Sequence, residues 1–148
     1  MARYCEYKEN IYTIKENRGF FMGDFVFRFQ KLEIYDLALD IVKDSYSLTR
    51  TFPAEERFAL VSQMNRAVVS IPSNIAEGVS RGSRKDQIHF LNISYGSLME
   101  LACQSDISCM LGYITDTQRK ELSTKIKNLA IKINNFISFI RKELKENV

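Results

Sequence analysis

The chain has 148 residues, of which 45% are apolar and 26% charged, and its formal net charge is +3. These values are ordinary for a soluble globular protein, exclude disordered and fibrous chains, and allow one domain with a substantial core. Three cysteines (Cys5, Cys103 and Cys109) form no paired framework, and the single His89 leaves too few ligands for a zinc site. We therefore expect no metal, no cofactor and reduced thiols in a cytoplasm. No apolar run reaches the roughly 18 residues of a membrane span.

The N-terminal part of the chain, residues 1–27, shows no sustained helical period. We expect it to be a poorly ordered or peripheral extension, and residues 28–148 to form the folded domain. A second interpretation is that translation starts at Met22 rather than Met1, because the preceding Asn-Arg-Gly can be encoded by a purine-rich ribosome-binding element.

The spacing of apolar residues predicts four helices, over about residues 29–50, 53–78, 84–112 and 116–145. One stripe of apolar residues at intervals of three and four marks the buried side of the first helix: Phe29, Leu32, Tyr35, Leu39, Val42 and Tyr46.

Prolines, glycines and capping residues place the helix ends. Pro53, followed by two glutamates, favours the start of the second helix. Pro72 should bend this helix, and Gly78 with Gly82 should end it. Ser83 and Thr115 each precede an acidic or amide side chain by three residues, as a helix N-terminus requires.

A nearly heptad seam marks the fourth helix: Leu122, Ile126, Leu129, Ile133, Phe136, Ile140 and Leu144. Four helices of this length with short connections predict an all-α fold, an antiparallel up-down four-helix bundle.

The second and third helices lack a charged solvent face. Residues 58–76 contain only Arg66 as a formal charge, and residues 89–110 contain only Glu100 and Asp106. A helix on the outside of a monomer normally carries a charged face. We therefore expect both helices to contact other subunits in a homo-oligomer.

A helical wheel divides the second helix into three faces. The core face has Leu60, Val61, Met64, Val68, Ile71, Ile75 and Val79, and a small-residue face has Ser62, Asn65, Val69, Ser73 and Ala76. The third face is polar, and together with Glu100 it allows either acid–base chemistry or a structural hydrogen-bond network. We favour a structural polar network, with Glu100 as the partner of Arg66, made of Gln63, Arg66, Ser70, Asn74, Glu77 and Glu100.

No constellation of catalytic residues is present, so we predict that the chain is not an enzyme. We expect His89 to be a partly exposed helix residue, and Cys103 and Cys109 to fill the core. No glycine-rich phosphate loop occurs.

Basic residues are concentrated near the C-terminus, where residues 116–148 hold eight Lys or Arg against four Asp or Glu. With three basic residues after the second helix, they form the predicted nucleic-acid-binding set: Arg81, Arg84, Lys85, Arg119, Lys120, Lys125, Lys127, Lys132, Arg141, Lys142 and Lys145. Such a set favours sequence-tolerant contact with the phosphates of structured RNA or DNA. The alternative is a protein-interaction scaffold that makes no nucleic-acid contact.

Three segments carry a family resemblance: QMNRA at 63–67, SIPSNIAEG at 70–78 and YGSLMEL at 95–101. They resemble the bacterial four-helix-bundle family of 23S rRNA intervening-sequence proteins, over about residues 29–144. That family is similar to the accessory variability determinant of diversity-generating retroelements. The resemblance implies a ring-like homopentamer that binds nucleic acid through basic surface and has no established catalytic activity.

Overall fold

The computed structural model describes residues 26–146, and every regular element in that range is helical. The four long helices are α2 (Glu33–Thr49), α3 (Leu60–Ser80), α4 (Arg84–Met110) and α5 (Asp116–Glu146), and two short 3-10 helices are η1 (Arg28–Lys31) and η2 (Ala54–Phe58). The prediction of an all-α fold is confirmed. Most of the predicted extension at residues 1–27, with both candidate start methionines, lies outside the described residues.

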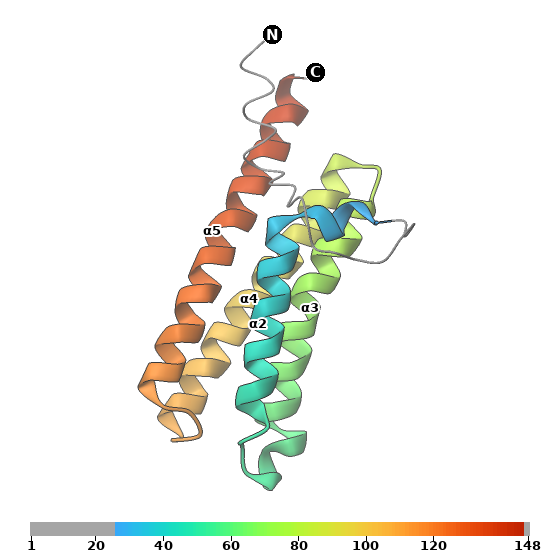
Figure 1. Ribbon diagram of the computed structural model, residues 1–148. Helices are drawn as coiled ribbons and strands as arrows, with labels where there is room; N and C mark the ends of the chain where they lie inside the picture. The colour runs from blue at the N-terminus through green and yellow to red at the C-terminus, as the bar shows by residue number, and fades with distance from the viewer. Residues whose placement is uncertain (1–25, 147–148) are drawn as a thin grey trace.

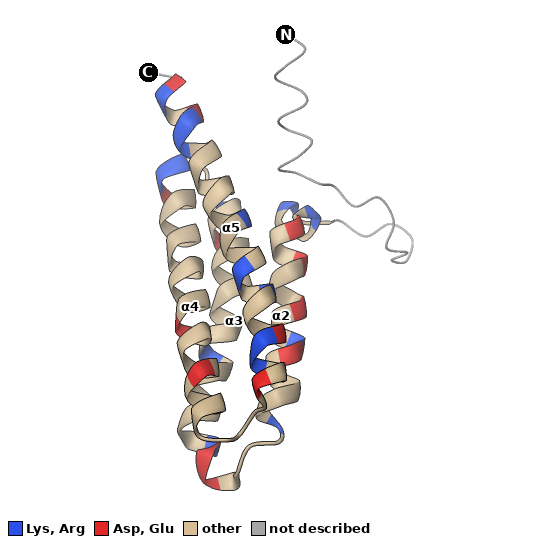
Figure 2. Cartoon of the chain, turned by 90° about the vertical axis from the view of Figure 1, so that its left-hand side faces the viewer, with Lys and Arg blue, Asp and Glu red and all other residues tan. Residues whose placement is uncertain are grey.

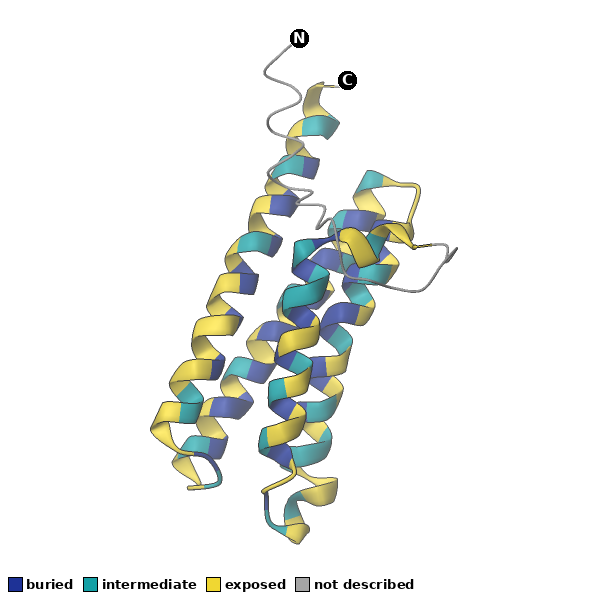
Figure 3. Ribbon diagram, viewed as in Figure 1, coloured by how far each residue is buried: buried dark blue, intermediate teal, exposed yellow. Residues whose placement is uncertain are grey.

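The long helices pack side by side, with each helix against the next in sequence and α2 also against α5 (Figure 1). Each turns a buried side inward and an exposed side outward (Figure 3). The core therefore runs along the middle of the four helices.

The first two predicted helices begin too early. Leu32 has extended backbone angles, so residues 29–50 divide into η1 and α2. Residues 53–78 divide at Ala59 into η2 and α3. Glu56 explains the second break, because its carboxylate accepts a hydrogen bond of 3.1 Å from the Leu60 backbone N–H and so caps α3.

The buried face of α2 differs from the predicted stripe. Leu39 and Tyr46 are exposed, whereas the face that meets the core has Ile34, Ala38, Ile41, Ser45 and Thr49. Small and β-branched side chains let α2 lie close to its neighbours, and the larger aromatic side chains remain at the rim.

The predicted cores of the last helix and of α3 are largely confirmed. Six of the seven seam residues of α5 are buried, and Leu144 is half-buried. On α3 the predicted core residues Met64, Val68, Ile71, Ile75 and Val79 are buried, while Leu60 and Val61 are half-buried.

Both predicted capping sites are confirmed, and the helix ends between Gly78 and Gly82. Thr115 exchanges hydrogen bonds with Gln118 at 2.9 and 3.1 Å, and the Ser83 hydroxyl accepts from the Asp86 N–H at 3.4 Å. Gly78 lies within α3, buried against α4, and α3 continues to Ser80.

Candidate functional site

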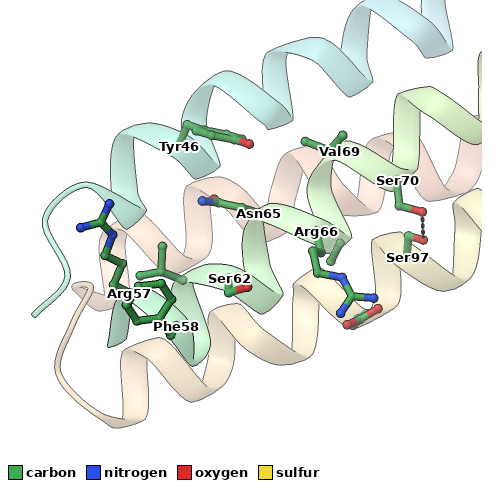
Figure 4. Close-up of a pocket in the computed structure, with 12 residues that line it drawn as sticks. Tyr46, Arg57, Phe58, Ser62, Asn65, Arg66, Val69, Ser70 and Ser97 are labelled. Atoms are coloured by element: carbon green, nitrogen blue, oxygen red, sulfur yellow. Dashed lines mark hydrogen bonds between the residues drawn. The ribbon is translucent and has the colours of Figure 1, made fainter. Parts of the chain in front are cut away.

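The outer sides of α3 and α4 form one surface, called here the α3–α4 surface, on which apolar side chains are exposed. They are Val69, Ile93, Met99, Ile107 and Met110, with Phe58 of η2 at one end, 88% exposed. Figure 4 shows a depression on this surface, lined from α2 by Tyr46, from α3 by Asn65 and Arg66, and from α4 by Ser97. The surface carries few charges and therefore suits contact with a protein.

Part of the predicted polar network is assembled here. The Ser70 and Ser97 hydroxyls are 2.8 Å apart (Figure 4). The Asn74 amide donates to the Ser70 carbonyl at 2.7 Å and to the Ser70 hydroxyl at 2.9 Å. The Ser70–Ser97 contact joins α3 to α4, whereas both Asn74 bonds lie within α3. Gln63, Arg66 and Glu77 are exposed and do not join them.

Arg66 and Glu100 both line the depression, but within residues 26–146 no ion pair connects them. Glu100 instead accepts a hydrogen bond of 3.0 Å from the Gln104 side chain. In the single chain the two charges are therefore open to solvent.

Serines on the buried side of α4 were missed by sequence reasoning. The Ser94 hydroxyl donates to the Ile71 carbonyl at 3.0 Å, and the Ser108 hydroxyl contacts the Gln104 carbonyl at 2.7 Å and the Met64 sulfur at 3.4 Å. The sequence does carry a sign of them. The large apolar residues of α4 are distributed around the helix and form no stripe, so that part of its buried side has to be polar.

The remaining Cys, His, Asp and Glu side chains of the described residues do not come together in one site. Cys103 is exposed and Cys109 half-buried, so the expectation of a core position was wrong for Cys103, whose place on α4 faces outward. Within residues 26–146 no group of His, Cys, Asp and Glu side chains is arranged to hold a metal ion. No helix in this part of the chain is both long and apolar enough to span a membrane.

Most of the predicted nucleic-acid-binding residues are engaged in ion pairs. Seven of the eleven have an acidic partner: Arg81 with Glu77, Arg84 with Glu143, Arg119 with Asp106 and Asp116, Lys120 with Asp116, Lys125 with Asp44, Lys132 with Glu33, and Lys142 with Glu146.

Two of these pairs hold α5 against α2. Lys132 contacts Glu33 at 3.0 Å, and Lys125 contacts Asp44, whose hydrogen bond raises the pKa of the Lys125 ammonium. A third group lies at the start of α5, where hydrogen bonds from Lys120 and then Arg119 lower the pKa of Asp116. These lysines therefore have structural partners already.

The other four basic residues, Lys85, Lys127, Arg141 and Lys145, are exposed and have no ion pair in the described part of the chain. At 100° per residue, the three on α5 fall within about 40° of one another. We call them the α5 cationic stripe. Figure 2 shows lysine and arginine gathered toward the C-terminal end of α5.

Comparison with known proteins identifies a matching family and solved structures of similar fold. Residues 30–135 match the model of the family described as 23S rRNA-intervening sequence protein. A crystal structure from Bacteroides thetaiotaomicron, of a protein of unknown function from the S23 ribosomal protein family, is similar with a TM-score of 0.66 and 24% identity. It covers 70% of this chain and 97% of its own, which supports the fold alone.

No protein with a curated description matches the sequence. The family model, however, spans well over half of the chain, from the end of η1 into the second half of α5. The chain therefore belongs to the 23S rRNA-intervening sequence protein family.

Proposed function

We propose that this protein is a non-enzymatic, cytoplasmic homo-oligomer that binds structured RNA or DNA through the α5 cationic stripe. The observation that supports this most is that Lys127, Arg141 and Lys145 are exposed on one side of α5 and have no acidic partner among residues 26–146. The family's name, which refers to 23S rRNA, makes RNA the first ligand to test.

The length of the stripe suits a nucleic-acid backbone. Lys127 and Lys145 are eighteen residues apart on one helix, which corresponds to about 27 Å. A cation repeated along that distance contacts several phosphates and releases their counterions. Because no side chain reads a base in this arrangement, affinity should depend weakly on sequence and steeply on salt.

Oligomerisation multiplies this effect. The exposed apolar residues of the α3–α4 surface would be covered by a second copy of the chain, in a ring-like pentamer of up-down four-helix protomers. Five stripes on one ring bind one RNA with a combined affinity well above that of a single stripe.

Salt-dependent RNA binding tests the proposal. Fluorescence anisotropy with a labelled RNA hairpin should show affinity falling steeply as salt rises. The triple variant Lys127→Gln, Arg141→Gln and Lys145→Gln should bind much more weakly, with a salt slope smaller by roughly three for each stripe that contacts the RNA.

The matched control replaces two lysines that already have acidic partners. Lys125→Gln with Lys132→Gln removes the same kind of charge from α5 but should leave the salt slope nearly unchanged. Equal losses in the control and the triple variant would contradict the assignment of the stripe.

The scaffold function stays as the second candidate, because seven of the eleven predicted cations are neutralised locally. An intact oligomer that binds no RNA or DNA even at low salt would favour a protein partner on the exposed surface instead.

A further inference from the structure

One end of the molecule gathers basic residues from three elements. The last turns of α5 meet the first turn of α4, where Arg84 contacts Glu143 at 2.8 Å. Counting partners among the described residues alone, the exposed cations without an ion pair at this end are Arg28 and Lys31 of η1, Lys85 of α4, and Arg141 and Lys145 of α5. Figures 1 and 2 place η1, the α3–α4 connection and the C-terminal end of α5 at the same end.

An aromatic cluster lies within this basic end, at the α3–α4 connection. The guanidinium carbon of Arg81 is 4.9 Å from the centre of the Phe90 ring. The His89 ring meets Phe90 edge-on, with centroids 5.4 Å apart, and is exposed. Arg81, His89 and Phe90 are called here the turn cluster.

Arg81 is fixed in a way that suits stacking better than phosphate contact. Glu77 forms an ion pair with its guanidinium and balances its charge, while the guanidinium lies over the Phe90 ring. The Arg81 side chain is nevertheless 49% exposed, so part of it is open to a ligand. A planar, supported and partly open guanidinium is a surface on which a nucleobase stacks.

We propose that the turn cluster stacks an unpaired nucleobase of a structured RNA, while Lys85 and the end of the α5 cationic stripe hold the flanking phosphates. This inference rests on the proposed RNA-binding function and gives it a preferred ligand, an RNA loop or bulge. The bases of a duplex are stacked on one another and do not offer a face, whereas those of a loop do. It also changes the role of Arg81 from phosphate contact to base contact.

A fluorescent base in the loop tests this stacking directly. An RNA hairpin with 2-aminopurine in its loop is titrated with the full-length protein, beside a blunt RNA duplex of equal charge. We expect the fluorescence of the loop base to fall on binding, and the hairpin to bind at least about fivefold tighter than the duplex, as one stacked base provides.

The main variant, Arg81→Lys, keeps the positive charge and removes the planar group. It should bring the hairpin affinity down to that of the duplex and abolish the fluorescence change, while duplex binding and its salt slope stay the same. The matched control, Lys85→Gln, should weaken both RNAs and lower both slopes by roughly one. Phe90→Leu, which keeps the apolar packing against α3, should resemble Arg81→Lys.

The outcomes separate the two proposals. Equal binding of hairpin and duplex, with constant loop fluorescence and no effect of Arg81→Lys, overturns the stacking site and leaves phosphate binding standing. Failure of both RNAs to bind at low salt refutes the proposed function itself.

Discussion

At Gly78, α3 approaches α4 so closely that an added Cβ would lie 2.9 Å from the Cβ of Phe90 and 3.3 Å from the Gln87 carbonyl oxygen. Neither atom is the end of a flexible side chain, so the two helices would have to separate. We expect Gly78→Ala to lower the free energy of unfolding by about 1 to 3 kcal/mol, as overpacking does.

Gly96 provides the control, because a Cβ added there meets nothing within 4 Å in the single chain. Gly96→Ala should raise stability by up to about 1 kcal/mol through helix propensity. Urea unfolding of both variants checks the pair. Stabilisation by Gly78→Ala would show that the contact between the helices is looser than described.

Asp116 gives a prediction about pH. Its pKa is lowered by hydrogen bonds from Lys120 and Arg119, so its carboxylate stabilises the fold above the ordinary aspartate pKa. That contribution is lost as pH falls through the lowered pKa of the folded state.

Asp116→Asn should therefore be less stable than the wild type near neutral pH, and the difference should shrink toward about pH 2. Urea unfolding across this range measures it. A constant difference at every pH would mean that charge at Asp116 has no part in stability.

At the scale of the element, the rotation of α4 about its own axis is set by hydrogen bonds. Its buried side has three leucines but six polar residues, and Ser94 bonds to the α3 backbone. We expect Ser94→Ala to cost about 1 kcal/mol, because the Ile71 carbonyl keeps its helical bond but loses this second donor.

Ser73→Ala is the matched control. The Ser73 hydroxyl donates at 2.8 Å to Val69 of its own helix and is exposed, so its removal should change stability by less than about 0.5 kcal/mol. Thermal melting compares the two variants. An equal effect of both would show that the contact between α3 and α4 contributes nothing.

How far the sequence predicts each helix depends on its pattern. α5 was predicted almost to the residue because its apolar seam is regular and Thr115 caps it. The start of α3 was not predicted. The hydrogen bond that the Glu56 carboxylate accepts from Leu60 decides where α3 begins, and the spacing of apolar residues does not reveal that bond. For α2, aromatic residues at helical spacing were indistinguishable from a core stripe.

The candidate site was predicted less well than the fold. The sequence identified basic residues but not their partners, since Asp44 and Glu33 lie far from Lys125 and Lys132 along the chain. Only the folded arrangement distinguishes a lysine that holds two helices together from one that is open to a ligand. The turn cluster was likewise missed, because His89 and Phe90 form it only together with Arg81, which directly follows α3.

At the scale of the whole molecule, the α3–α4 surface predicts self-association. Val69→Lys with Ile93→Lys places two charges on that surface, and we expect the mass by light scattering to fall to the 17.2 kDa of one chain. Circular dichroism should show unchanged helicity, because both side chains are exposed in the protomer.

Ile131→Lys is the matched control, since Ile131 is 51% exposed on α5, away from the α3–α4 surface. It should leave the mass of the oligomer as in the wild type. A wild-type protein that is a stable single chain at micromolar concentration would contradict the whole assembly.

The polar interior of α4 also bears on the order of folding. Helices with continuous apolar faces, such as α3 and α5, gain from early collapse, whereas α4, with six polar residues on its buried side, gains less from it. We expect the hydrogen bond of Ser94 to form after this collapse. Contacts that form after the transition state affect mainly the unfolding rate. In stopped-flow measurements, loss of the Ser94 hydroxyl should therefore accelerate unfolding and leave the refolding rate almost unchanged.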